Sequence, residues 1–182
     1  MQQRQTAVIG VVVILLTALL LINMAFWTGL VPFPFSREFA RDVKPQSIEL
    51  CPVNSEPVEV SGISMRVYNS SNIEGVAGQA SQALTDAGVT VNETANWGGD
   101  AVSGVAQIYT SLDAVDKAYT IKGFVPKAKV IYDATLPSDS VDLIIGNDWD
   151  TTTSLMPSPT AEEFAAAMEA PEGCTPRDDI QQ

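Results

Sequence analysis

Three short polar stretches of this sequence hold the side chains best suited to binding a ligand. The first is Asn69-Ser70-Ser71-Asn72, which stands before a segment with helical apolar periodicity. Free amides and the helix dipole at a helix N-terminus favour an anion, so a pyrophosphate or a glycan carboxylate would suit this position. The alternative is that these side chains only cap the helix, because every helix leaves its first amides unsatisfied.

The other two stretches place a tryptophan among polar residues. Residues 96–100 read NWGGD, and Trp149 lies in a similar stretch at 147–150. A ring on a Gly-rich loop can stack on a sugar face, here with Asn96 and Asp100 supplying hydrogen bonds to it. The alternative is that Trp97 and Trp149 pack at the core edge. Sugar binding is favoured if the fold brings both rings to one side.

Most of the familiar catalytic arrangements are excluded because the sequence contains no histidine. Ser-His-Asp and Cys-His catalysis and HExxH zinc sites all require it. Carboxylates do occur in pairs, at 139/142, 148/150 and 162/163. General acid chemistry needs two carboxylates held apart in one cleft, which local spacing does not establish, and no EF-hand pattern is present. We expect a solvated acidic surface, with no catalytic residue, no metal and no cofactor.

The charge of the chain argues against nucleic acid as a partner. The formal net charge is -12, and no acidic residue occurs before residue 31. A surface this acidic repels phosphate backbones, so we expect no nucleic-acid binding.

Residues 7–31 form an uncharged, largely apolar run that predicts one transmembrane helix. About 20 apolar residues cross a hydrocarbon core of about 30 Å, whereas the apolar region of a signal peptide spans about 7–15 residues. A cleaved signal peptide is the alternative. Arg4 precedes the run and Arg37, Arg41 and Lys44 follow it, so the positive-inside rule mildly opposes a cytoplasmic N-terminus.

Cys51 and Cys174 are the only cysteines and bracket almost the whole folded region. For a loop of about 100 residues, a disulfide contributes about 4.7 kcal/mol in chain-entropy models. Such bonds persist in oxidising compartments, which favours a domain outside the cytoplasm. Two separate thiols are the alternative.

The periodicity predicts an α/β domain of the α+β two-layer type, with two helices on one face of a small mixed sheet. Residues 73–87, for example, place apolar side chains on one helical face, and Gly88 follows where a left-handed residue ends a helix. The predicted strands are 63–68, 89–91, 105–110, 129–132 and 141–145, and the predicted helices are 73–87, 112–124 and 160–169.

These residues resemble the LytR C-terminal domain family of bacterial cell-envelope proteins. The resemblance covers residues 64–150, about half of the chain. The residues that carry it are Val67-Tyr68-Asn69, Gly75-Val76-Ala77, Leu84, Gly88, Val89, Val91, Ala95-Asn96 and the stretch VDLIIGNDW at 141–149. With Cys51-Pro52 and the apolar run, the chain looks like the Cei-type envelope integrity proteins of actinobacteria.

The resemblance implies a single-pass plasma-membrane protein whose C-terminal domain is extracytoplasmic. Family members accompany phosphotransferases that attach glycopolymers to peptidoglycan, but this chain lacks that domain, so ligase activity does not carry over. We predict a non-enzymatic module that binds an envelope partner protein or a wall glycan. A carboxylate-dependent glycan hydrolase or transferase, and a structural subunit of a membrane complex, are the alternatives. The predicted organisation is a cytoplasmic tail (1–6), a transmembrane helix (7–31), a stalk and lead-in segment (32–60), the α/β domain (61–150), and a C-terminal helix and tail (151–182).

Overall fold

The computed structural model describes residues 10, 12–21, 24 and 48–180, and the chain divides into two units, Met1–Lys44 and Pro45–Gln182. In the first unit, residues 12–21 are helical. Much of the predicted span, and all of the predicted cytoplasmic tail, lie outside the described residues. Among the residues that are described, no helix combines the length and apolar character needed to cross a membrane.

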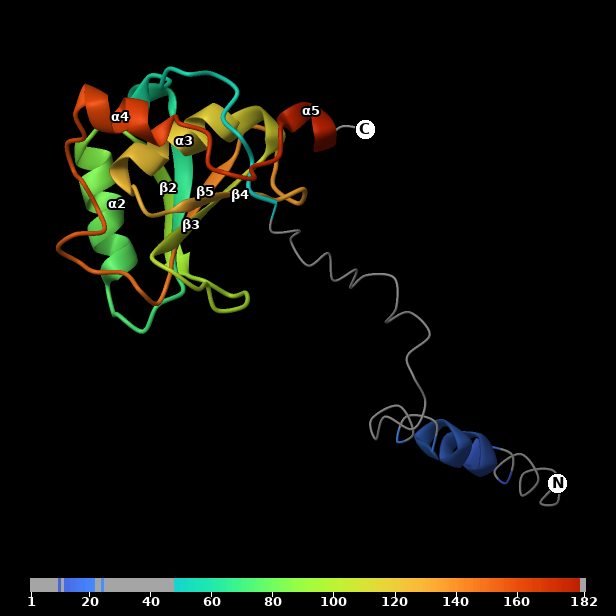
Figure 1. Ribbon diagram of the computed structural model, residues 1–182. Coiled ribbons are helices and arrows are strands. Elements are labelled where there is room, and N and C mark those ends of the chain that lie inside the picture. Colours follow the sequence, from blue (N-terminus) through green and yellow to red (C-terminus); the bar gives the residue numbers. More distant parts are fainter. Residues whose placement is uncertain (1–9, 11, 22–23, 25–47, 181–182) are drawn as a thin grey trace. The chain divides into compact units, whose positions relative to one another are not determined.

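The second unit is built on a mixed five-stranded sheet (Figure 1). Its strands lie in the order β2-β1-β5-β3-β4. Strand β1 is parallel to β2 and β5, whereas β3 is antiparallel to β5 and parallel to β4. The mixed sheet predicted from the sequence is therefore confirmed. The strand bounds are β1 Ser64–Asn69, β2 Thr90–Asn96, β3 Ala106–Thr110, β4 Lys129–Tyr132 and β5 Val141–Ile145.

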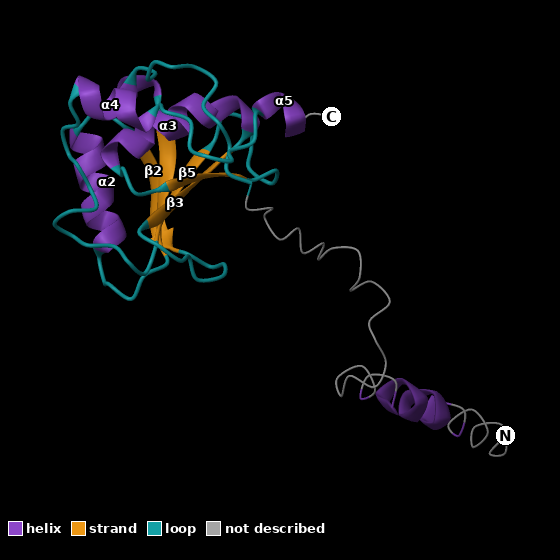
Figure 2. Ribbon diagram, viewed as in Figure 1, coloured by secondary structure: helices purple, strands orange, loops and turns teal. Residues whose placement is uncertain are grey.

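Helices cover one face of this sheet (Figure 2). Alternate strand residues such as Met65, Val67 and Leu143 point to that face and are fully buried against the helices. Burying one such side chain contributes about 1.5–3 kcal/mol. The helical elements are η1 Val60–Gly62, α2 Val76–Asp86, η2 Leu112–Ala114, α3 Val115–Phe124, α4 Ala161–Ala167 and α5 Arg177–Ile180.

The end of α2 shows how local sequence fixes an element boundary. Gly88 follows the helix with φ +99°, a backbone conformation that L side chains rarely adopt. The amide of Val89 donates to the carbonyl of Leu84, and that of Gly88 to Thr85. These two bonds form a Schellman motif, which satisfies carbonyls that the helix end leaves open. The helix stop predicted at Gly88 is therefore confirmed.

Strand β2 is longer than its sequence indicates. The sequence predicts a strand over residues 89–91 only, yet β2 continues to Asn96. Its backbone pairs with β1, where Arg66 lies beside Glu93 and Asn69 beside Asn96. Main-chain pairing with a core strand therefore overrides the low strand propensity of these side chains.

The face of the sheet away from the helices carries a smaller cluster of partly and fully buried residues. Tyr68, Tyr109 and Ile144 alternate with the core residues along their strands, and Trp97 packs against this cluster. The fold thus has one main core between sheet and helices and a second cluster on the opposite face.

The two chain segments that flank the domain close over the β4 edge of the sheet. The amide of Tyr132 donates to Ile48, and the amide of Leu50 donates to Val130. Leu50 in turn forms a parallel bridge with Thr175. The predicted C-terminal tail is therefore tied to the domain at Thr175, and the short helix α5 follows this bridge.

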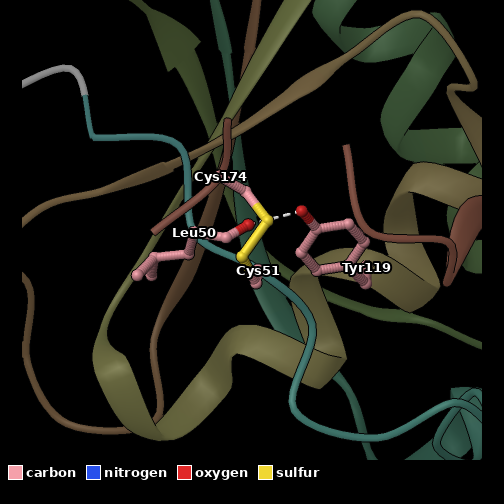
Figure 3. Close-up of a disulfide and its surroundings, with 4 residues drawn as sticks. All are labelled: Leu50, Cys51, Tyr119 and Cys174. Atoms are coloured by element: carbon pink, nitrogen blue, oxygen red, sulfur yellow. Dashed lines mark hydrogen bonds between the residues drawn. A yellow bond between two sulfur atoms is a disulfide. The ribbon is translucent and has the colours of Figure 1, made fainter. Parts of the chain in front are cut away.

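The predicted disulfide between Cys51 and Cys174 is confirmed (Figure 3). The two residues are 123 positions apart in the sequence, so the bond joins the start of the domain to its end. The alternative of two separate thiols does not hold, since neither cysteine is free.

Candidate functional site

A cleft of about 630 Å³ opens at the carboxyl ends of β1 and β2. Open α/β sheets characteristically bind ligands in a crevice beyond the carboxyl ends of their strands. The cleft brings together two of the three polar stretches singled out in the sequence. Residues 69–75 line one side, and Asn96, Trp97, Gly99 and Ala101 line the other.

The floor of the cleft is a turn that satisfies its own polar groups. Asn69 Oδ1 accepts hydrogen bonds from the amide of Ser71 at 2.9 Å and from its hydroxyl at 2.7 Å. Asn69 Nδ2 donates to the carbonyl of Ile73 at 2.8 Å, and the amide of Ile73 donates to Ser71 Oγ. An Asn side chain that bonds backbone two residues on is a self-contained Asx turn. Asn69 and Ser71 therefore shape the floor of the cleft.

Two further bonds tie this floor to its surroundings. The carbonyl of Asn69 accepts from the amide of Trp97 at 2.8 Å, which joins the two sides of the cleft. Ser70 Oγ accepts from the amide of Val102 at 2.9 Å, and the Ser70 amide donates to Ile145 on β5. The cleft is thus formed in advance of any ligand, because β1, β2 and β5 all hold its floor.

The interpretation of residues 69–72 as a helix cap is wrong. Helix α2 begins at Val76, three residues later than predicted, and no side chain caps it. Gly75, with φ +73°, makes the turn into the helix instead. The Asn69 side chain is already bound to residues 71 and 73, so it has no capacity left for the helix amides.

Trp97 forms the aromatic wall of the cleft and is held on several sides. Its ring lies 5.6 Å from that of Tyr68 and 5.8 Å from that of Tyr109, measured between centroids. Its indole Nε1 donates to the carbonyl of Asp100 at 3.0 Å. A Cβ built on Gly99 would stand 2.7 Å from the same nitrogen, closer than real contacts allow. The half-buried indole is therefore fixed in orientation.

Three polar side chains of the cleft have no partner within the described part of the chain. Asn72, Glu74 and Asn96 are exposed and line the cleft. An Asn amide offers two donors and one acceptor oxygen, and a carboxylate accepts only. These three side chains are the ones able to contact a ligand directly, and of them the sequence analysis did not identify Glu74, which it placed inside the predicted helix.

Trp149 does not share a surface with Trp97. It is 6% exposed and belongs to the main core on the helix side of the sheet, whereas Trp97 packs on the opposite face. The Trp149 amide donates to Gly146 in a turn, and Trp149 lines one surface depression together with Val76 and Ala80 of α2. A platform made by both tryptophans is therefore not formed. Asp100 contributes its carbonyl to the indole rather than its carboxylate to the cleft.

In each of the three carboxylate pairs noted in the sequence, at least one member makes a structural contact. Asp142 bonds the guanidinium of Arg66 at 2.7 and 2.6 Å, and burial raises the pKa of Asp142 against the opposing effect of that arginine. Asp139 pairs with Lys117 at 2.6 Å. The amides of residues 152 and 153 donate to Asp150 and lower its pKa, and Glu163 completes the capping box of α4.

No metal site accompanies these contacts in the described ranges, where no three His, Cys, Asp or Glu side chains come together. Glu74 is the one ionisable side chain that lines the cleft. The cleft can therefore bind a ligand through hydrogen bonds and through contact with the Trp97 ring.

A comparison with known protein families finds a match over the residues that contain the cleft. Residues 62–149 match the family model LytR_C, described as the LytR cell envelope-related transcriptional attenuator. The domain is a LytR C-terminal domain. The family resemblance drawn from the sequence is thus confirmed, over the residues that contain the cleft.

The LytR C-terminal domain also has a solved structural relative. It is the soluble domain of a conserved hypothetical secreted protein from Mycobacterium marinum, with a TM-score of 0.50 and 21% sequence identity. The match covers 65% of this chain and 95% of that chain, and it shows that the two share a fold. No curated protein matches the sequence.

Proposed function

We propose that this LytR C-terminal domain is a non-enzymatic binding module of the cell envelope. Its ligand, a wall glycan or a partner protein, occupies the cleft between residues 69–75 and residues 96–101. The observation that carries this proposal is the cleft itself, whose floor is fixed by β1, β2 and β5 while Asn72, Glu74 and Asn96 stay open to a ligand. A preformed site of this kind avoids the entropic cost of ordering its walls on binding.

A binding role fits the cleft better than hydrolysis or transfer does. Glycoside hydrolysis requires a pair of carboxylates about 5–9.5 Å apart flanking the bond to be cleaved. The cleft has Glu74 alone, and the carboxylates of Asp139, Asp142 and Glu163 are engaged in ion pairs or a helix cap elsewhere. A single carboxylate without a second acid or base is suited to binding a ligand, and not to hydrolysing it.

We propose further that the domain is held outside the cytoplasm by the uncharged run at residues 7–31. The length of that run in the sequence supports an anchor. The disulfide between Cys51 and Cys174 supports an oxidising compartment, where such bonds persist. Membrane fractionation of cells that make the full chain tests the anchor, and protease added to intact spheroplasts tests the side. Release by an alkaline wash, or protection of the domain from protease, would contradict this placement.

The binding proposal is tested with the full chain, purified in detergent, against insoluble wall polymer and against solubilised membrane protein. We expect retention on one of the two, weakened in a variant that carries both Asn72→Ala and Asn96→Ala. These side chains are exposed and make no bond within the described structure, so the variant keeps its fold. Soluble sugar released from the wall by the wild type, and not by this variant, would contradict a non-enzymatic role.

A further inference from the structure

The polar composition of the cleft points to the charge of its ligand. Asn and Ser account for five of its lining residues, Asn69, Ser70, Ser71, Asn72 and Asn96. The cleft has one carboxylate, Glu74, and no Lys or Arg among its lining residues. The whole chain carries a formal net charge of -12, so the surrounding field repels anions as well. A phosphate or carboxylate group would find no cation here to offset the loss of its hydration.

We propose that the cleft binds an uncharged, polyhydroxylated ligand, a segment of a neutral glycan, and discriminates against anionic polymers. This inference rests on the proposed function, because it assigns a ligand class to the same cleft. The volume of about 630 Å³ lies within the range of about 300–1,000 Å³ typical of small-molecule sites.

Sugar hydroxyls match the free groups of the cleft. Each hydroxyl both donates and accepts a hydrogen bond, and the amides of Asn72 and Asn96 offer both functions from opposite sides. Glu74 accepts from hydroxyls and repels a neighbouring phosphate. Trp97 supplies an apolar surface for the C–H groups of a sugar ring, in an orientation fixed by Tyr68 and Tyr109.

The residues of the cleft divide accordingly into two roles. Asn72, Glu74, Asn96 and Trp97 contact the ligand. Asn69 positions them, since its Oδ1 already accepts two hydrogen bonds from Ser71 and its Nδ2 donates to the carbonyl of Ile73.

The test uses the neutral and the acidic fractions of Mycobacterium marinum wall polysaccharide, separated by anion exchange. Binding of the full chain to each fraction is measured by biolayer interferometry. Asn72→Ala and Asn96→Ala are expected to weaken binding of the neutral fraction roughly 3–10-fold each, the value of one net hydrogen bond. Asn92→Ala is the matched control, because Asn92 lies on β2 like Asn96 but bonds Ser64 outside the cleft. Glu74→Lys is expected to increase binding of the acidic fraction.

The outcomes separate this inference from the proposed function. Wild-type preference for the neutral fraction, lost in the cleft variants and kept in Asn92→Ala, supports the inference. Preference for the acidic fraction, if weakened by the same variants, overturns the uncharged ligand and leaves a binding module. Equal binding by wild type and cleft variants overturns the site. Binding of neither fraction overturns the inference. If a photocrosslinker at residue 72 also captures no envelope protein, the proposed function fails with it.

Discussion

Tyr119 on α3 donates its phenolic hydroxyl to the carbonyl oxygen of Leu50, one residue before the disulfide (Figure 3). Both residues are completely buried. The bond fastens the segment that enters the domain to the helix layer, at the same place where Cys51 is joined to Cys174. The start of the domain is therefore held by a covalent bond and by a buried hydrogen bond side by side.

The substitution Tyr119→Phe should destabilise the domain by about 1–2 kcal/mol, because it leaves the buried Leu50 carbonyl without its donor. Urea unfolding followed by circular dichroism measures this change. Tyr132→Phe is the matched control. The Tyr132 hydroxyl has no partner in the described chain, so a change below about 0.5 kcal/mol is expected. Equal effects of the two substitutions would contradict the role assigned to this bond.

The same tyrosine predicts a loss of stability in alkaline solution. Burial raises the pKa of Tyr119 well above its ordinary value of about 10. Below pH ~10 the phenol is neutral in both states and its contribution is fully present. Above that pH the unfolded chain releases the proton and the folded chain keeps it, so stability falls as pH rises. The free energies of unfolding of wild type and Tyr119→Phe should diverge between about pH 8 and 11.5, with a weaker pH dependence in the variant. The same pH dependence in both proteins would exclude this explanation.

Removal of the disulfide should lower the free energy of unfolding by most of the entropic contribution that closing the loop makes. For a loop of about 100 residues this term is about 4.7 kcal/mol, and we expect Cys51→Ser with Cys174→Ser to lose about 3–5 kcal/mol. Equilibrium unfolding in urea is the measurement. Wild type unfolded in the presence of reductant provides the comparison and should match the double variant. A loss below about 1 kcal/mol in both would show that the unfolded chain is restrained by other means.

Arg66 and Arg177 each form an ion pair at 2.6 Å, and the carboxylates that they bind differ in burial. The Asp142 side chain is 4% exposed, so Arg66→Ala leaves a buried carboxylate without its two hydrogen bonds. We expect a loss of about 2–3 kcal/mol, seen as a lower Tm. Asp113, the partner of Arg177, is 54% exposed, so Arg177→Ala should cost less than about 1 kcal/mol. Adding Asp142→Asn to Arg66→Ala should restore part of the loss, and a further loss instead would contradict the argument.

Gly98 and Gly99 are neighbours in the cleft loop with opposite tolerance for a side chain. A Cβ on Gly99 would meet the Trp97 ring at 2.7–2.9 Å, whereas a Cβ on Gly98 meets nothing within 4 Å. Gly99→Ala should displace the indole and cost about 1–3 kcal/mol, the usual range for overpacking. Trp97 fluorescence, isolated by subtracting the spectrum of Trp97→Phe, should shift in Gly99→Ala and stay unchanged in Gly98→Ala. An unshifted spectrum in both variants would mean that the loop backbone moves and the Trp97 ring does not.

Much of the fold could be predicted from the sequence because its signals are local. The apolar alternation of β1, the helical spacing of α2 and the glycine that ends it at Gly88 all depend on residues near one another. The order of elements from β1 to α4 followed from such patterns. The extension of β2 to Asn96 and the pairing of Thr175 with the lead-in segment depend on backbone partners distant in sequence, which composition does not reveal.

The candidate site was predictable in its residues and not in its geometry. Asn69 and Trp97 stood out by type, but their proximity follows from β1 and β2 being neighbours in parallel. The burial of Trp149 depends on a turn that carries it to the helix face. No local pattern identified Glu74 as a cleft residue, because the predicted helix began before it. The sequence did not indicate that Gly75 adopts a left-handed conformation and delays the start of the helix.

The two edges of the sheet set a limit on self-assembly. At β4 the neighbouring backbone is already engaged by residues 48–50, and these in turn by Thr175. Within the described residues β2 is the outermost strand at the other end and keeps one side of its backbone unpaired. A sheet with two free edges can add molecules at both and grow into a fibre. A sheet with one free edge can pair with one other copy, and edge-to-edge association then stops at two molecules.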